Sequence, residues 1–196
     1  MAVLPNLKDV LKVKGGDLTQ IKLALRHLAE KEVLVGFPED TTKRDDMDIT
    51  GMTNAALGYI HNTGMPEENI PQREFMESGI KDGKAKITEQ LSGVAKRILR
   101  DRSLDVAVQG LHRVGVTAML ALKKKINEGV PPPLADRTLQ ERIRKGAKSG
   151  QKSAKKELER RAQGLAPSTE FAKPLIDSGA LRNSISYVIR NRKDRK

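Results

Sequence analysis

The residue types that most often carry chemistry are sparse in this sequence. It has three histidines, His27, His61 and His112, and no cysteine. Without cysteine there is no disulfide, no thiolate nucleophile and no cysteine-bound zinc or iron–sulfur cluster. His27 and His112 have no histidine or acidic residue four positions later, so the helical spacing of zinc enzymes is missing. We interpret these two as core or surface side chains, and His61, near the turn at Gly64, as a structural hydrogen-bonding residue.

Other combinations of polar residues also fall short of a recognisable site. Asp45, Asp46 and Asp48 form an acidic cluster, but the glutamate that closes a calcium-binding loop at position 12 is missing. No glycine pattern matches a phosphate-binding loop, and Ser178 lies outside a GxSxG nucleophile elbow. The sequence therefore predicts a non-enzymatic protein with no cofactor and no metal. A hydrolase that uses lone Ser and His residues is the weakest hypothesis.

The elements that would position any site follow from the spacing of apolar residues. Helical spacing predicts helices over residues 18–31, 54–62, 73–99 and 104–128. Residues 33–37 are rich in β-branched types and end before Pro38, which predicts a buried strand. Residues 39–53 are polar and aperiodic, which predicts a loop that contains the acidic cluster. Together with a closing strand over 184–189, these elements predict an α+β fold, in which a small antiparallel or mixed sheet packs against several long helices.

A tight turn is expected just before the closing strand. Asp177 can bond to its own backbone and Gly179 can adopt a positive φ, so the chain is expected to turn tightly there. Leu181 is expected to anchor the turn. Alternation then places Ile185, Tyr187 and Ile189 on one face of the strand. The strand edge is a natural place for another copy of the chain to add a strand.

The residues just before the predicted long helix, 73–99, also favour a particular local structure. Pro71 fixes its own φ and keeps Ile70 extended, so the helix is expected to start there. Phe75, one of three phenylalanines, is expected in the core. Arg73 has two interpretations of equal weight: a bidentate pair with a carboxylate, within the subunit or across an interface, or a surface residue at a helix start.

Positive charge gathers in the last third of the chain. Residues 137–196 contain 17 lysine and arginine residues against 6 aspartate and glutamate residues, which accounts for +11 of the net charge of +12. Residues 138–165 are basic and poor in large apolar residues, which predicts a basic helical extension, exposed or partly disordered. Such asymmetry indicates a polyanionic or acidic partner, although a solvated helix face is an equally good interpretation of any one cluster. The candidate contacts to DNA or to an acidic partner are Lys155, Lys156, Arg160 and Arg161.

Composition also bears on assembly and location. Hydrophobic residues make up 37% of the chain and aromatic residues 3%, which indicates a thin core that oligomerisation would support. The alternative is a helical monomer with long charged arms. The first residues contain no long apolar run, so neither a signal peptide nor a membrane span is expected. We therefore expect a soluble, cytoplasmic protein without membrane contact.

Three segments in this order resemble the tail-completion and virion-morphogenesis proteins of tailed bacteriophages, a group that includes neck proteins and minor tail components. They are NA and YIHNTG within 54–64, IPQREFM at 70–76, and PLIDSGALRNSI at 174–185. The family pattern is roughly NA…IHE-G…IPxRPF followed by PLxDTGxLxxSI. This sequence departs from it at Asn62, Glu74 and Ser178, where the family usually has Glu, Pro and Thr.

The resemblance implies a structural virion protein at the head–tail junction. It implies one α/β domain over 1–136 and 166–196, with 137–165 as a basic helical arm or insertion. Members assemble in the host cytoplasm into a homo-oligomeric ring, a hexamer by tail symmetry or a twelvefold ring on the portal side. Their partners are other copies and neighbouring neck and tail proteins. The residues expected at interfaces or in structural roles are Arg73, Phe75, Asp177, Gly179, Leu181, Ile185 and Tyr187.

A second hypothesis comes from charge alone. Residues 142–161 could neutralise several phosphates and make the chain a non-specific nucleic-acid-binding accessory protein, or bring a ring subunit into contact with packaged DNA. No aromatic residues are interleaved with these charges, so stacking on single strands is not expected. No sequence-reading motif accompanies them, so sequence-specific recognition is not expected either.

Overall fold

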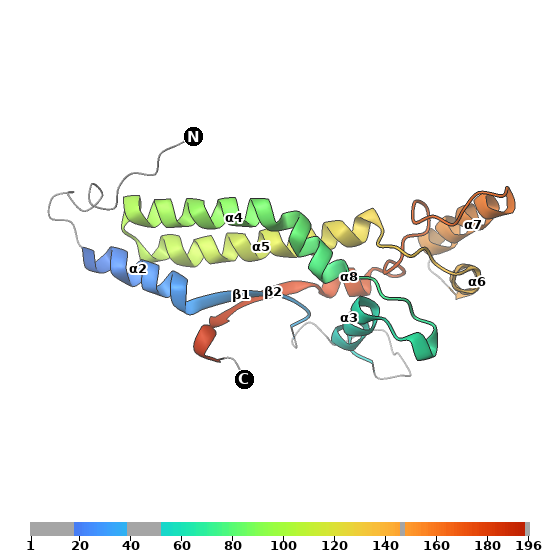
Figure 1. The fold of residues 1–196 in the computed structure, drawn as a ribbon, viewed down its shortest axis with the longest axis horizontal. Coiled ribbons are helices and arrows are strands. Elements are labelled where there is room, and N and C mark those ends of the chain that lie inside the picture. Colours follow the sequence, from blue (N-terminus) through green and yellow to red (C-terminus); the bar gives the residue numbers. More distant parts are fainter. Residues whose placement is uncertain (1–17, 39–51, 146–147, 195–196) are drawn as a thin grey trace.

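The computed structural model describes residues 18–38, 52–145 and 148–194. Two long helices, α4 (Phe75–Asp101) and α5 (Leu104–Glu128), lie side by side as an antiparallel hairpin (Figure 1). The hairpin turns at Arg102, which has a φ of 50°, and the Ser103 hydroxyl then caps α5 by accepting a hydrogen bond from the Asp105 N–H. Large apolar residues at helical spacing hold the two helices together, because they leave one stripe of each helix free for burial.

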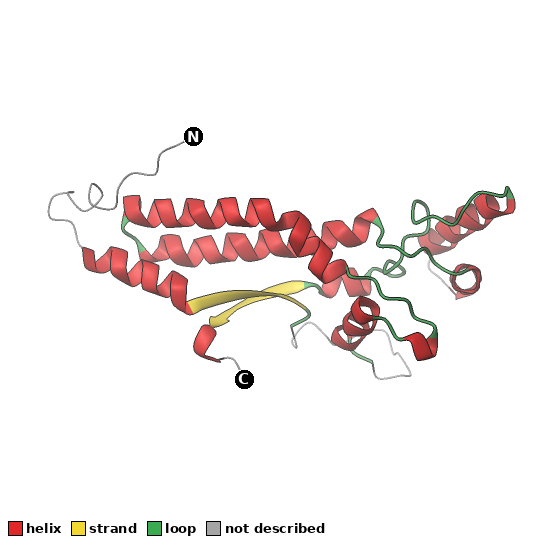
Figure 2. Cartoon of the chain, in the orientation of Figure 1, coloured by secondary structure: helices red, strands yellow, loops and turns green. Residues whose placement is uncertain are grey.

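A two-stranded antiparallel sheet lies along α5 on the side away from α4 (Figures 1 and 2). Its first strand, β1 (Lys31–Gly36), directly follows α2 (Leu18–Glu30), and its second, β2 (Ser186–Asn191), lies near the end of the chain. Val33 is paired with Ile189, and Leu34 with Val188. The two strands are thus joined across almost the whole length of the sequence.

Only one face of this sheet is covered by α5. Tyr187 lies on that face, and its ring sits so close to Gly115 that a Cβ there would be 2.2 Å from a ring carbon. Alternation turns Leu34 and Val188 to the opposite face, where Val188 is 41% exposed. Packing on one side is therefore what keeps the strands half-buried.

The remaining elements form two groups (Figure 1). Near the end of the sheet, α3 (Asn54–Thr63) lies against α8 (Ala180–Ser184). The helix pair α6 (Asp136–Lys145) and α7 (Lys148–Ala162) lies at the far end of the molecule, beyond the end of α5. Single 3₁₀ turns, Pro66–Glu68 and Arg192–Asp194, complete the described elements.

Buried apolar side chains form three clusters. The main cluster joins the start of α4, the end of α5 and the entry to β2, and contains Phe75, Leu122, Ile126, Val130 and Ile185. A second lies where α2 crosses the hairpin and contains Ala24, Val94, Ile98 and Ala107. A third belongs to the α6–α7 pair and contains Leu134, Leu139, Ala154 and Ala172. The core is divided along an elongated molecule (Figure 1).

The α+β fold, with a small antiparallel sheet against long helices, is confirmed. The helix predicted over 104–128 is α5, and the one predicted over 54–62 ends one residue later, at Thr63. The predicted pairing of the two strands is present, and Phe75 is fully buried as expected. Among the described helices, none combines the length and apolar character needed to cross a bilayer.

Four details of the sequence-based prediction are wrong. The strand predicted over 33–37 is Lys31–Gly36, and it is half-buried and not buried, because only one face has a helix against it. The long helix begins at Phe75 and not at Arg73, because Glu74, with a φ of −68° and a ψ of 60°, lies outside the helical region, and the Phe75 N–H donates to the Arg73 carbonyl at 2.7 Å. Ser184 belongs to α8, so the closing strand begins at Ser186.

The fourth correction concerns the basic stretch 138–165. It was expected to have little to bury, yet Leu139 and Ala154 are fully buried between α6 and α7. Leu134 and Ala172, which flank the stretch, complete this small core. Among the residues predicted as a loop, 39–51 lie outside the described residues together with Asp45, Asp46 and Asp48, and Thr53 caps α3.

Candidate functional site

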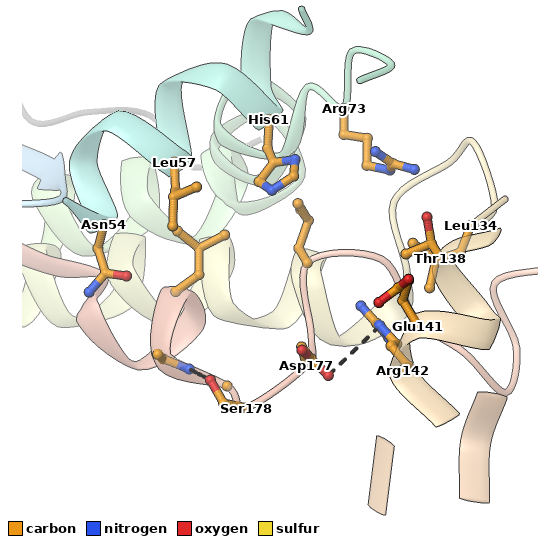
Figure 3. A pocket seen from close by; sticks show the side chains of 14 residues that line it. Asn54, Leu57, His61, Arg73, Leu134, Thr138, Glu141, Arg142, Asp177 and Ser178 are labelled. Carbon is orange, nitrogen blue, oxygen red and sulfur yellow. Dashed lines mark hydrogen bonds and ion pairs between the residues drawn. The ribbon is translucent and has the colours of Figure 1, made fainter. Parts of the chain in front are cut away.

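A cleft of about 420 Å³ lies between α3, α6 and the segment 174–181 (Figure 3). Its walls bring together the segments that carry the resemblance to tail-completion proteins, although 54 and 181 are far apart in the sequence. The residues that line it are Asn54, Leu57, His61, Arg73, Leu134, Thr138, Glu141, Arg142, Leu175, Asp177, Ser178, Gly179, Ala180 and Leu181.

The first two segments are joined by hydrogen bonds at the start of α4. The Arg73 N–H donates to the His61 carbonyl at 2.9 Å. The buried Asn62 side chain accepts from the Met76 N–H at 3.1 Å and donates to the Glu77 carboxylate at 3.2 Å. Asn62 therefore fixes the end of α3 against the first turn of α4, a role that needs both a donor and an acceptor.

The third segment forms the floor of the cleft through its turn. Gly179 has a φ of 86°, as the turn prediction required, and begins α8. The Ser178 hydroxyl accepts from the Ala180 N–H at 3.3 Å (Figure 3). Asp177 stands on the exposed side of this turn and faces α6 (Figure 3). The turn thus places one carboxylate at the mouth of the cleft.

Arg73 is not the surface residue that one of its two interpretations suggested. Its side chain is buried, with the residue 5% exposed, and its Nε and Nη2 both donate to the Pro132 carbonyl, at 3.2 and 3.0 Å. Its Nη1 donates to the Pro71 carbonyl at 3.4 Å. Among the described residues no carboxylate forms a salt bridge with it, and a pair with a carboxylate across an interface stays a prediction. Burial, and next the charge of Arg142, lowers the pKa of Arg73.

Arg142 is a second buried arginine on the opposite wall. Its side chain is 10% exposed, and Nη1 donates to the Lys173 carbonyl at 3.1 Å. Its Nε lies 3.9 Å from the Asp177 carboxylate, which is an ion pair longer than a hydrogen bond. Burial lowers the pKa of Arg142, and the charge of Asp177 opposes this. Sequence reasoning missed this residue, although its place three residues after the buried Leu139 puts it on the inner face of α6.

Two polar atoms in the cleft wall are buried without a hydrogen-bond partner within the described part of the chain. They are Oδ1 of Asn54 and Nδ1 of His61. Its Nδ1 thus does not make the structural hydrogen bond expected of His61, whose backbone carbonyl accepts from the Arg73 N–H. Burial, and next the charge of Arg73, lowers the pKa of His61, which favours the neutral imidazole.

The charged groups of the cleft are two arginines and two carboxylates. Arg73 and Arg142 are largely buried, whereas Asp177 is mostly exposed and Glu141 pairs with Arg144. The Ser178 hydroxyl has no base at its side among the interactions of Figure 3. Across the described residues, no group of three or more His, Cys, Asp or Glu side chains could hold a metal ion.

The other residues expected at interfaces lie away from the cleft or at its edge. Leu181 and Gly179 line it, whereas Phe75 and Ile185 belong to the main hydrophobic cluster. The Tyr187 hydroxyl lies 3.2 Å from Nδ1 of His112, a residue of α5, and the two rings meet edge to face. The predicted set is thus divided between the cleft and the packing of β2.

The basic residues of α7 differ in their surroundings. Lys155 and Lys156 are exposed, and the Lys156 ammonium lies 5.7 Å from the centre of the Phe171 ring. Arg160 and Arg161 bind the carboxylate of Glu157, which is fully buried. Arg161 also binds Asp136. Arg160 and Arg161, two of the four residues predicted to contact an anion, therefore have their charge neutralised by carboxylates of the same subunit.

No protein-family model matches the sequence, and no curated protein and no solved structure matches the chain significantly. The likeness to phage proteins therefore depends on the short motifs in this sequence and on where the fold places them.

Proposed function

We propose that this chain is a structural virion protein that assembles with copies of itself into a ring at the head–tail junction of a tailed bacteriophage. In this role it completes the head-proximal end of the tail and joins it to neighbouring neck and tail proteins. It acts by fitting surfaces together and performs no catalysis.

The observation that supports this proposal best is the convergence of the three resembling segments. Each segment is short. The first two are separated only by residues 65–69, so their proximity follows from the chain, whereas the third lies far along the sequence and has no such reason to lie beside them. Here the segment with His61 is hydrogen-bonded to the segment with Arg73, and α3 of the first lies against α8 of the third. The motifs therefore describe one local structure, which is what a family pattern would preserve.

The sheet offers a means of self-assembly. Within the described residues, β1 and β2 pair only with each other, so each strand has one edge with no strand beside it. Leu34 and Val188 add a paired apolar contact on the face turned away from α5. Unpaired strand edges with an apolar face are templates for adding a strand from another subunit.

The test uses virus particles assembled without the protein. We expect filled heads and finished tails to accumulate separately, and purified protein added to this mixture to restore infectious particles. Electron microscopy and plaque counts provide the two measurements, and an added extract without the protein is the control. Complete and infectious particles that form in its absence would reject the proposed role.

The second candidate function is non-specific binding of nucleic acid through α7. The observation in its favour is the exposed group Lys152, Lys155 and Lys156 on that helix. The pairing of Arg160 and Arg161 with Glu157 weakens it, because paired arginines have less charge to offer to phosphates. Charge reversal at these arginines would also disturb the fold, so the exposed lysines are the residues to test.

A further inference from the structure

The cleft between α3, α6 and the segment 174–181 contains two arginines that have no carboxylate of the described residues within hydrogen-bond distance. Arg73 and Arg142 are both largely buried there. Of the two carboxylates on its walls, Glu141 is bound to Arg144 at 2.7 Å. The other, Asp177, has 61% of its side chain exposed and stays 3.9 Å from Arg142.

Several polar groups in the wall also lack a partner. Asn54 is 4% exposed, and its Oδ1 has no hydrogen bond in the described structure. The same holds for Nδ1 of His61. Buried polar groups are nearly always satisfied, and the Oδ1 of Asn54 is an acceptor, so its partner would be a backbone N–H of the bound segment and not a carboxylate. Three of the five N–H groups of Arg73 donate to carbonyls, which leaves two for that partner.

The apolar walls of the cleft limit which chemical groups this partner can have. Leucine side chains form much of the wall around the charged end: Leu57, Leu134, Leu175 and Leu181. A ligand that fits has a negative group next to apolar atoms. A DNA phosphate fits poorly, because a duplex lies on the surface and is reached by long, exposed basic side chains, whereas Arg73 and Arg142 are recessed.

We propose that this cleft is a receptor for an acidic side chain of a neighbouring protein subunit, presented on a short segment with apolar residues on either side. The carboxylate takes the place of Asp177 beside the guanidinium of Arg142, with the free N–H groups of Arg73 behind it. The apolar neighbours rest on the leucines. Before the segment binds, Asp177 lies at the mouth of the cleft and competes weakly for the guanidinium of Arg142.

This inference deepens the proposed function, because it rests on that function for the source of the segment. The binding itself is independent of the virus and can be measured on the isolated chain. If the peptide fails to bind, the result of the particle experiment still stands. If infectivity is restored, the proposal for the cleft still requires that the peptide binds.

The experiment uses the full-length protein and two blocked peptides, Gly-Leu-Glu-Leu-Gly and the same sequence with Gln in place of Glu. Dissociation constants are measured by NMR titration, with the Arg142 Nε–H and Arg73 Nε–H signals as local reporters. We expect the glutamate peptide to bind at least about tenfold more tightly than the glutamine peptide, since charge-assisted hydrogen bonds are about twice as strong as neutral ones. The Arg142 signal should shift with saturation.

Three variants make the test specific. Arg142→Gln should lose about tenfold in affinity for the glutamate peptide. Arg137→Gln is the matched control, because it removes an exposed arginine of the same helix that does not line the cleft, and it should bind as the unchanged protein does. Asp177→Asn should bind several-fold more tightly, because the competing charge is gone and the exposed side chain is not needed for folding.

Each other outcome overturns the proposal. Equal affinity of the two peptides would show that the cleft does not recognise charge. Equal losses in Arg142→Gln and Arg137→Gln would show general attraction to a basic protein. Weaker binding by Asp177→Asn would mean that Asp177 supports the ligand and does not compete with it. Displacement of the peptide by a short DNA duplex would assign the cleft to phosphate.

Discussion

Replacement of Glu157 by glutamine should destabilise the α6–α7 pair by about 2–3 kcal/mol at neutral pH. Glu157 is fully buried and accepts hydrogen bonds from Arg160, Arg161 and the Ser168 N–H. Glutamine keeps the volume but removes the charge that neutralises two largely buried arginines. Removal of one partner from a buried ion pair costs about 3–5 kcal/mol, and the value here is lower because both guanidinium groups retain some contact with solvent.

The effect of this change should depend on pH. Burial acts to raise the pKa of the Glu157 carboxyl, but the hydrogen bonds from Arg160, the Ser168 N–H and Arg161 outweigh it and lower the pKa from 4.5 to about 2. Because the folded-state pKa lies below the unfolded value, the stabilisation is complete above pH 4.5 and is lost as the pH falls towards 2. This pKa difference corresponds to at most about 3 kcal/mol, which solvent screening reduces to about 2 kcal/mol.

The measurement is the free energy of unfolding from urea titrations followed by circular dichroism, with hydrogen exchange of the α7 amides as a local probe. The difference between the unchanged protein and Glu157→Gln should shrink to below about 1 kcal/mol near pH 2, because the carboxyl is then about half protonated in the folded state and almost fully protonated in the unfolded state. Glu159→Gln, an exposed change on the same helix, is the control and should cost less than about 0.5 kcal/mol. Equal effects of the two variants, or a difference that stays constant with pH, would refute the reasoning.

Two further predictions concern the sheet and the basic helix. Gly115→Ala should destabilise the protein by about 1–3 kcal/mol, because its Cβ would lie 2.2 Å from the Tyr187 ring, whereas Gly93→Ala, with nothing within 4 Å, should stabilise it by about 0.5–1 kcal/mol. Thermal unfolding measures both, and similar shifts would contradict the packing of β2 on α5. Charge reversal at Lys155 and Lys156 should flatten the dependence of DNA affinity on salt without changing thermal unfolding. If the wild type shows no salt-dependent DNA binding at low ionic strength, the second candidate function is rejected.

Local patterns in the sequence predicted the elements well, because the spacing of apolar residues decides which face of a helix can be buried. The helix over 104–128 was predicted to the residue, and the turn at Gly179 followed from its tolerance of positive φ. The partner of Arg73 could not be predicted, because the Pro132 carbonyl is 59 residues away and any backbone oxygen in the core could have served. No local rule connects the two.

The small core of the α6–α7 pair was missed for a different reason. Leu139 and Ala154 are isolated apolar residues in strongly polar helices, and neither helix alone has enough to bury. Their burial needs Leu134 and Ala172 from outside the two helices. One wall of the cleft could have been predicted from the sequence, since Arg142 shares the inner face of α6 with Leu139. The division into one domain and an inserted arm stays a prediction.

The hydrogen bonds from Arg73 to the Pro132 carbonyl connect two parts of the subunit. One guanidinium spans from the first residues before α4 to the connection that carries the far helix pair, and it does so from the back wall of the cleft. A ligand in that cleft would therefore contact the side chain that joins the start of α4 to the connection leading to α6.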